Sequence, residues 1–144
     1  MAAIEEVQKN IVDEFVIFDD WMDRYNYLIE LSNELPVIDE KKKNNDYLIR
    51  GCQSKVWLDA QYQDGKIIYT ADSDAIITKG IIALLIRVLS GRTPQEIMNA
   101  KLEFIDQIGL KQNLSPTRAN GLLSMIKQMR LYAIAYDAKE KKNK

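Results

Sequence analysis

The sequence predicts an α+β fold in which a small antiparallel β-sheet of about three strands is flanked by helices. Apolar residues recur at helical spacing towards both ends of the chain, whereas the middle alternates apolar and polar residues on either side of an Asp-Gly pair. At 144 residues, with 47% apolar and 28% charged residues, the chain suits one compact domain spanning residues 1–144.

The first third of the chain predicts two amphipathic helices. Apolar residues recur at spacings of three and four over residues 4–18, as they do on one face of a helix. An Asp-Asp pair then supplies a cap for a second helix over residues 21–35, which Pro36 ends. Residues 39–45 are rich in lysine, acid and asparagine, so we expect an exposed, solvated loop there.

The central stretch predicts a β-hairpin. Apolar and polar residues alternate over residues 56–63, the Asp-Gly pair at 64–65 forms a two-residue turn, and the strand pattern resumes over 67–71. Residues 48–49 are too few to define a strand by themselves, but they would add a third one. Cys52 would then lie at a strand-to-strand turn.

An apolar run over residues 75–89 follows the hairpin. A membrane-spanning segment needs about 20 residues with few charges, and Lys79 and Arg87 interrupt this shorter run. We therefore expect a central buried helix that packs on one face of the sheet. Asp72 and Asp74 precede it, and acids at the positive end of a helix dipole favour a capping role for both.

The last third predicts further helices. Residues 93–99 begin with a capping box and a proline at the first helical position, and residues 102–110 hold another short helical piece. A long last helix begins at a second Ser-Pro start and has apolar residues on its inner face over residues 116–136. Gly121 lies within it, and we interpret this glycine as a point of close packing beneath the Cys52 loop.

The absence of histidine restricts the chemistry of the chain. Neither a Ser-His-Asp nor a Cys-His arrangement is possible, and one cysteine without histidine supplies no zinc or iron-sulfur ligand set. No Walker-type or dinucleotide-type glycine pattern occurs. Cys52 therefore remains as a thiolate nucleophile, a redox sensor or an inert buried thiol. It follows a glycine at the entrance to a strand, on the kind of loop that carries function.

The overall charge favours neither nucleic acid nor membrane as a partner. A net charge of -1, from 20 basic and 21 acidic residues, gives no global attraction to phosphate backbones or anionic lipid. Residues 1–6 contain acids where a secretory signal has basic residues, so we expect a cytoplasmic location.

Three separated motifs carry a specific resemblance. They are Gly51-Cys52-Gln53-Ser54-x-Val56-Trp57, Asp72-Ser73-Asp74-Ala75 with Lys79-Gly80-Ile81-Ile82-Ala83, and Ser115-Pro116-Thr117-Arg118 with Gly121-Leu122. Together they resemble the SufE family of sulfur-acceptor proteins, over nearly the whole chain. The resemblance implies a fold shared with IscU-type cluster scaffolds, which use several cysteine ligands. A chain with one cysteine is expected to carry sulfur and to hold no cluster.

The resemblance also implies a function. Cys52 would receive persulfide sulfur from a SufS-type cysteine desulfurase, stimulate that enzyme, and pass the sulfur to the SufBCD scaffold for iron-sulfur cluster assembly. The chain itself would need no cofactor, because the pyridoxal phosphate belongs to the desulfurase. A CsdE-type partner of another desulfurase, a thiol redox sensor and a structural adaptor remain alternatives. Both a monomer and a homodimer are compatible with the sequence.

The expected site centres on the Cys52 loop. In the family the idle thiol lies in an apolar pocket, so sulfur transfer requires the loop to swing outward, with Gly51 as the natural hinge. Gln53 and Ser54 complete the loop and the surroundings of the thiol.

Two residues outside the loop are also expected at the site. Arg118 matches the arginine of the family's Ser/Thr-Pro-x-Arg segment, and its charge would stabilise the Cys52 thiolate or engage the desulfurase. In the first turn of a helix a cation is disfavoured by the helix dipole, which argues against a purely structural arginine. Asp74 is expected near the Cys52 loop, where it would restrain the loop or contact the desulfurase.

Overall fold

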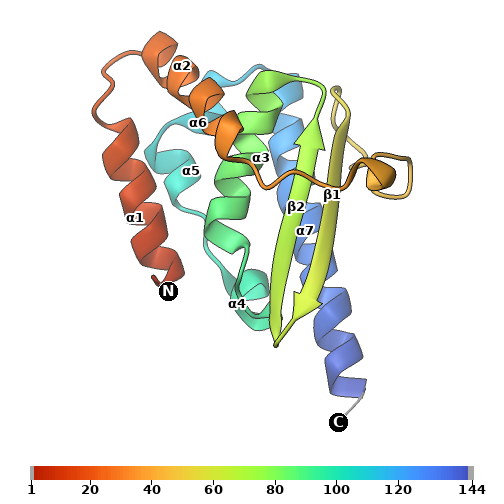
Figure 1. The fold of residues 1–144 in the computed structure, drawn as a ribbon. Coiled ribbons are helices and arrows are strands. Elements are labelled where there is room, and N and C mark those ends of the chain that lie inside the picture. The colour runs from red at the N-terminus through yellow and green to blue at the C-terminus, as the bar shows by residue number, and fades with distance from the viewer. Residues whose placement is uncertain (1, 143–144) are drawn as a thin grey trace.

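The computed structural model describes residues 2–142 (Figure 1). The α-helices of this part are α1 (Ile4–Phe15), α2 (Trp21–Leu31), α3 (Ile76–Leu89), α4 (Pro94–Asn99), α5 (Phe104–Gln107), α6 (Leu110–Asn113) and α7 (Pro116–Lys142). Two 3-10 turns, η1 (Ser32–Glu34) and η2 (Glu40–Lys42), precede the strands β1 (Val56–Gln63) and β2 (Lys66–Ser73). The predicted α+β class with an antiparallel sheet flanked by helices is confirmed.

The sheet is a two-stranded antiparallel hairpin. Its register pairs Gln63 with Lys66 across the predicted two-residue turn, which confirms the hairpin. The expected third strand is wrong: Leu48 makes only an isolated bridge to Trp57. A turn before Tyr47 and the left-handed Gly51 after it leave too few extended residues for a ladder.

The segment before the hairpin borders both edges of the sheet. Ile38 N donates to Ala71 O at 3.0 Å along the β2 edge, and Ile49 N donates to Val56 O at 2.8 Å along the β1 edge. These short contacts satisfy backbone groups that an open sheet edge would expose. They also fix the position at which the chain enters the Cys52 loop.

Helix α3 is the centre of the core, as its apolar sequence predicts. Eleven of its 14 residues are buried, and it lies between the hairpin and the N-terminal helices (Figure 1). Helix α7 packs beside it against the hairpin, and the Tyr69 hydroxyl donates to Met129 O at 2.7 Å inside this contact. Helix α7 runs on through the Asn-Gly pair, which confirms one continuous last helix, and extends to Lys142.

The first two helices are shorter than the apolar spacing predicts. Helix α1 ends at Phe15 because the chain turns at Phe18, whose carbonyl accepts from Arg24 Nε at 2.9 Å. The predicted cap of α2 is confirmed, since the Asp20 carboxylate accepts from the Asp23 backbone N–H. Helix α2 then gives way to η1, before the predicted end.

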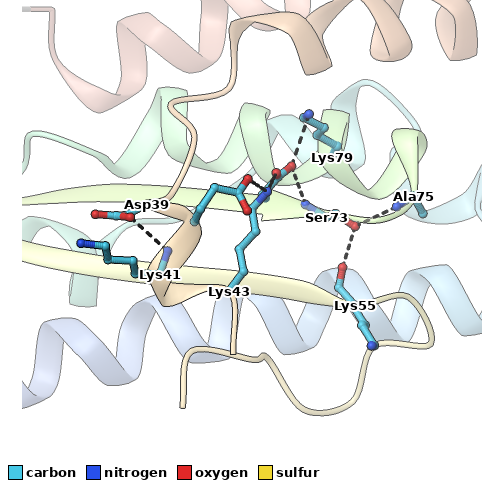
Figure 2. A network of polar contacts seen from close by, with 9 residues as sticks. Asp39, Lys41, Lys43, Lys55, Ser73, Ala75 and Lys79 are labelled. Atoms are coloured by element: carbon cyan, nitrogen blue, oxygen red, sulfur yellow. Dashed lines mark hydrogen bonds and ion pairs between the residues drawn. The ribbon is translucent and has the colours of Figure 1, made fainter. Parts of the chain in front are cut away.

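The predicted caps of α3 are wrong. Helix α3 has no side-chain cap, and Asp72 instead pairs with Lys43 and, at 3.3 Å, with Lys79 (Figure 2). Burial raises the pKa of Asp72, but the hydrogen bonds from Lys43, the Ser73 N–H and Lys79 lower it by more, so the pKa lies below its usual value. The carboxylate therefore joins three separate segments while it stays ionised.

The loop predicted to be merely solvated carries structural contacts. Lys42 Nζ lies 2.7 Å from Asp59 Oδ2 on β1, and Lys43 reaches Asp72 at the end of β2. Lys42 of η2 and Lys43, which follows it, thus attach this loop to the two strands of the hairpin. None of the helices within residues 2–142 is both long and apolar enough to cross a membrane, and no cluster there of three or more His, Cys, Asp or Glu side chains could hold a metal ion.

Candidate functional site

The Cys52 loop is fixed at its first end by Gly51. Gly51 has a φ of 95°, in the left-handed region that favours glycine. A Cβ at this position would lie 2.4 Å from Ser124 Oγ of α7, closer than any real contact allows. The left-handed backbone therefore favours glycine here, and a side chain at this position would also force the Ser124 hydroxyl to move.

The loop is fixed at its second end by the β2–α3 junction. Lys55 N donates to Asp74 Oδ1 at 2.9 Å, and Lys55 O accepts from Asp74 N at 3.2 Å. The Ser73 hydroxyl donates to the same carbonyl at 2.9 Å, as Figure 2 shows. Asp74 thus lies beside the loop, as predicted, and its carboxylate binds the loop backbone instead of capping α3.

Cys52 lies between these two anchors and is half-buried. Its Sγ donates to the carbonyl oxygen of Gly121 at 3.6 Å. An ideal Cβ on Gly121 would lie 3.5 Å from Sγ, so the predicted close approach of α7 beneath the loop is confirmed. Burial raises the pKa of the Cys52 thiol, which keeps the resting thiol protonated at neutral pH.

A small cavity of about 90 Å³ opens beside the thiol. Its lining residues come from the loop, α3 and α7: Cys52, Gln53, Ser54, Thr78, Ile81, Thr117, Arg118, Gly121 and Met125. The structure thus brings four predicted site residues to one cavity, with Gly51 next to them in the chain, whereas Asp74 acts on the loop from outside it.

Arg118 lies in the first turn of α7, as predicted. Its backbone N–H donates to Ser115 Oγ at 3.2 Å, and its guanidinium donates to the Tyr25 hydroxyl. Helical spacing alone places Tyr25 on the inner face of the predicted second helix, and it does not indicate this contact because Arg118 is 93 residues away. Ser124, which limits the space at Gly51, was missed for the same reason.

Fold and site together define a class: a small α+β domain that carries one thiol on a doubly anchored loop, next to a cavity whose lining includes one arginine. The family model described as "SufE: Fe-S metabolism associated domain" matches residues 9–133. The chain therefore belongs to the SufE family. This result confirms the resemblance that its three motifs indicate.

Curated relatives agree with this assignment. An uncharacterized SufE-like protein of Rhizobium etli is 38% identical over 135 residues, covering 90% of this chain and 88% of the relative. One from Synechocystis is 40% identical over 126 residues, covering 88% and 79%. The chloroplastic/mitochondrial SufE-like protein 1 of Arabidopsis thaliana is 34% identical over 143 residues, covering 96% of this chain and 38% of that protein.

A solved structure shares the fold. The solution structure of a hypothetical protein from Thermus thermophilus superposes with a TM-score of 0.73 at 19% identity, covering 90% of this chain and 94% of that one. At this identity the likeness supports the fold alone.

Replacing Gly51 by alanine is expected to open the loop. The left-handed backbone and the contact with Ser124 strain only the closed loop, by about 1 to 3 kcal/mol, so the exposed form gains roughly tenfold or more in population. Cys52 alkylation by iodoacetamide should then be faster by that factor. Gly65→Ala is the matched control, since Gly65 has a φ of 79° with open space around it. Equal alkylation rates in the two variants would contradict the anchor at Gly51.

Replacing Asp74 by alanine is expected to loosen the other end of the loop. Lys55 N loses its carboxylate partner, a hydrogen bond worth about 1 kcal/mol, so Cys52 alkylation should accelerate roughly threefold to tenfold. Asp74→Asn keeps an acceptor oxygen and should stay near the original rate. If Asp74→Ala lowered the melting temperature and left the alkylation rate unchanged, Asp74 would not restrain the loop.

Proposed function

We propose that this chain accepts persulfide sulfur from a SufS-type cysteine desulfurase on Cys52, stimulates that desulfurase, and delivers the sulfur to the SufBCD scaffold for iron-sulfur cluster assembly. The observation that carries the proposal is the placement of the sole thiol of a SufE-family chain on a loop anchored at both ends beside a small cavity. A CsdE-type role with another desulfurase would use the same site.

The chemistry is a thiol–persulfide exchange. The Cys52 thiolate attacks the outer sulfur of the desulfurase persulfide, a new S–S bond forms on Cys52, and the old S–S bond breaks. The desulfurase cysteine leaves as a thiolate, so no external oxidant or reductant takes part. Burial keeps the resting thiol protonated. Sulfur transfer therefore requires the loop to open and the thiol to lose its proton at the partner's active site.

The surroundings of Cys52 favour a carrier over a redox sensor. Sensor cysteines react through an exposed thiolate of low pKa, often with a second cysteine to resolve the oxidised form. Here the thiol is half-buried, its pKa is raised, and the sequence contains no second cysteine. A persulfide on Cys52 therefore has no internal thiol to discharge it, as delivery to another protein requires.

The other site residues have supporting roles in this proposal. Asp74 holds the loop closed until the desulfurase binds nearby, and Gly51 is the hinge. Arg118, which lines the cavity, provides a positive charge for the Cys52 thiolate and for the persulfide anion that the exchange produces. The chain acts in the cytoplasm without a cofactor of its own, since the pyridoxal phosphate belongs to the desulfurase.

The proposal is tested by incubating the protein with the desulfurase and cysteine. Intact-protein mass spectrometry should then show one added sulfur, which peptide mapping places on Cys52 and a reductant removes. Cys52→Ser should fold with an unchanged melting temperature and gain no sulfur, because a hydroxyl is a far weaker nucleophile at neutral pH. Full stimulation of desulfurase turnover by Cys52→Ser would reject the carrier function and leave allosteric activation.

A further inference from the structure

The guanidinium of Arg118 is held in place without losing its charge. Arg118 is exposed, yet its Nη1 donates to the Tyr25 hydroxyl and its Cζ lies 5.9 Å from the centroid of the Tyr25 ring. Ordering an exposed arginine costs side-chain entropy, which its hydrogen bond to an uncharged hydroxyl and an exposed cation–π contact largely offset. The arrangement therefore adds little to stability.

The neighbouring tyrosine of α2 shows the contrast. Tyr27 donates to Glu14, and Glu14 pairs with Arg87, so that arginine is neutralised by a carboxylate. Arg118 has no carboxylate within 4.0 Å among residues 2–142. Its partner Tyr25 is uncharged, so the positive charge stays available to an incoming anion.

Arg118 lines the same cavity as the Cys52 thiol. Of the residues in the described part of the chain that line the Cys52 cavity, Arg118 alone carries a formal charge. Tyr25 is half-buried on α2, and its ring packs edge-on against Trp21, with 6.3 Å between the two ring centroids. Helix α2 is itself fixed on α3, since a Cβ on Gly80 would lie 2.3 Å from Leu28 O. The core thus determines where the Tyr25 hydroxyl lies.

We propose that Tyr25 is a positioning residue that holds the Arg118 guanidinium at the Cys52 cavity, where it stabilises the terminal sulfur anion of persulfide-loaded Cys52. The inference rests on the proposed function. When thiolate attacks the outer sulfur, one S–S bond forms and one breaks, and the product perthiol gives its proton to the released thiolate. The anion that remains in a small, half-buried cavity needs a counter-charge, and among the described residues that line this cavity Arg118 alone carries a positive charge.

The test loads Cys52 with cysteine persulfide and measures how alkylation of the terminal sulfur depends on pH. Tyr25→Phe keeps the ring and removes the hydroxyl, and Tyr25→Leu removes both. Loss of the hydrogen bond to a charged group should lower the rate of loading roughly threefold to tenfold in Tyr25→Phe, and raise the pH midpoint by roughly half a unit to one unit. Tyr25→Leu should change both the loading rate and the pH midpoint by more than Tyr25→Phe does.

Tyr27→Phe is the matched control, because it removes a hydroxyl from the same helix away from the cavity. It should leave the loading rate and the pH midpoint unchanged even where it lowers the melting temperature. In an Arg118→Ala background, Tyr25→Phe should add nothing, because the two residues act as one unit. Arg118→Lys should restore only part of the loading rate that Arg118→Ala loses, since an ammonium lacks the planar donor geometry of a guanidinium.

Two results would overturn the inference. One is a Tyr25→Phe variant that matches Tyr27→Phe in pH midpoint and loading rate, and the other is a Tyr25→Phe effect that persists in full without Arg118. Either result leaves the carrier function intact, provided that Cys52 still gains sulfur. If neither cysteine persulfide nor the desulfurase places sulfur on Cys52, the proposed function and this inference both fail.

Discussion

The backbone of the Cys52 loop is held at two ends, and the state of the thiol depends on that constraint. At one end Gly51 takes a left-handed conformation directly against Ser124. At the other end Lys55 exchanges backbone and side-chain hydrogen bonds with the β2–α3 junction. Between these anchors Sγ lies against the Gly121 carbonyl, half-buried above α7. The core that supports both anchors is built from α3, α7 and the hairpin.

Charge is distributed around the site in a complementary way. Burial raises the pKa of the thiol and keeps it neutral, while Arg118, which lines the same cavity, donates to a neutral tyrosine. Among the described residues that line the cavity, Arg118 is thus the one formal charge, and no carboxylate of residues 2–142 lies within 4.0 Å of it. At Asp72, by contrast, the carboxylate is already compensated by two lysines.

Sequence reasoning succeeded where the relevant interactions are local. A two-residue Asp-Gly turn and the capping box of α4 involve neighbours in the chain, and both are confirmed. The position of Gly121 beneath the thiol followed from an Asn-Gly pair inside an apolar helix pattern. The assignment of Cys52 as the centre of the site stays a prediction, which followed from the absence of any other thiol or imidazole.

The failures involve partners far apart in the chain. Asp72 was expected to cap a helix, but its carboxylate reaches Lys43, whose loop position no periodicity predicts. The predicted third strand consisted of residues 48–49 alone and depended on tertiary pairing. Gly51, in a left-handed conformation, ends the extended segment after a single bridge. Tyr25 has the spacing of a core residue, and only the folded contact of α2 with α7 shows that its hydroxyl holds an arginine. Propensity contains no information about such pairs.

The most direct measurement of the central claim is the rate of Cys52 alkylation in the free protein as a function of pH, with the urea-unfolded protein as reference. A thiol held closed and half-buried should titrate with a pKa above that of the unfolded chain, and its limiting rate at high pH should be lower. A folded-state pKa at or below the unfolded value, with an equal limiting rate, would contradict the sheltered thiol on which the proposed carrier mechanism depends.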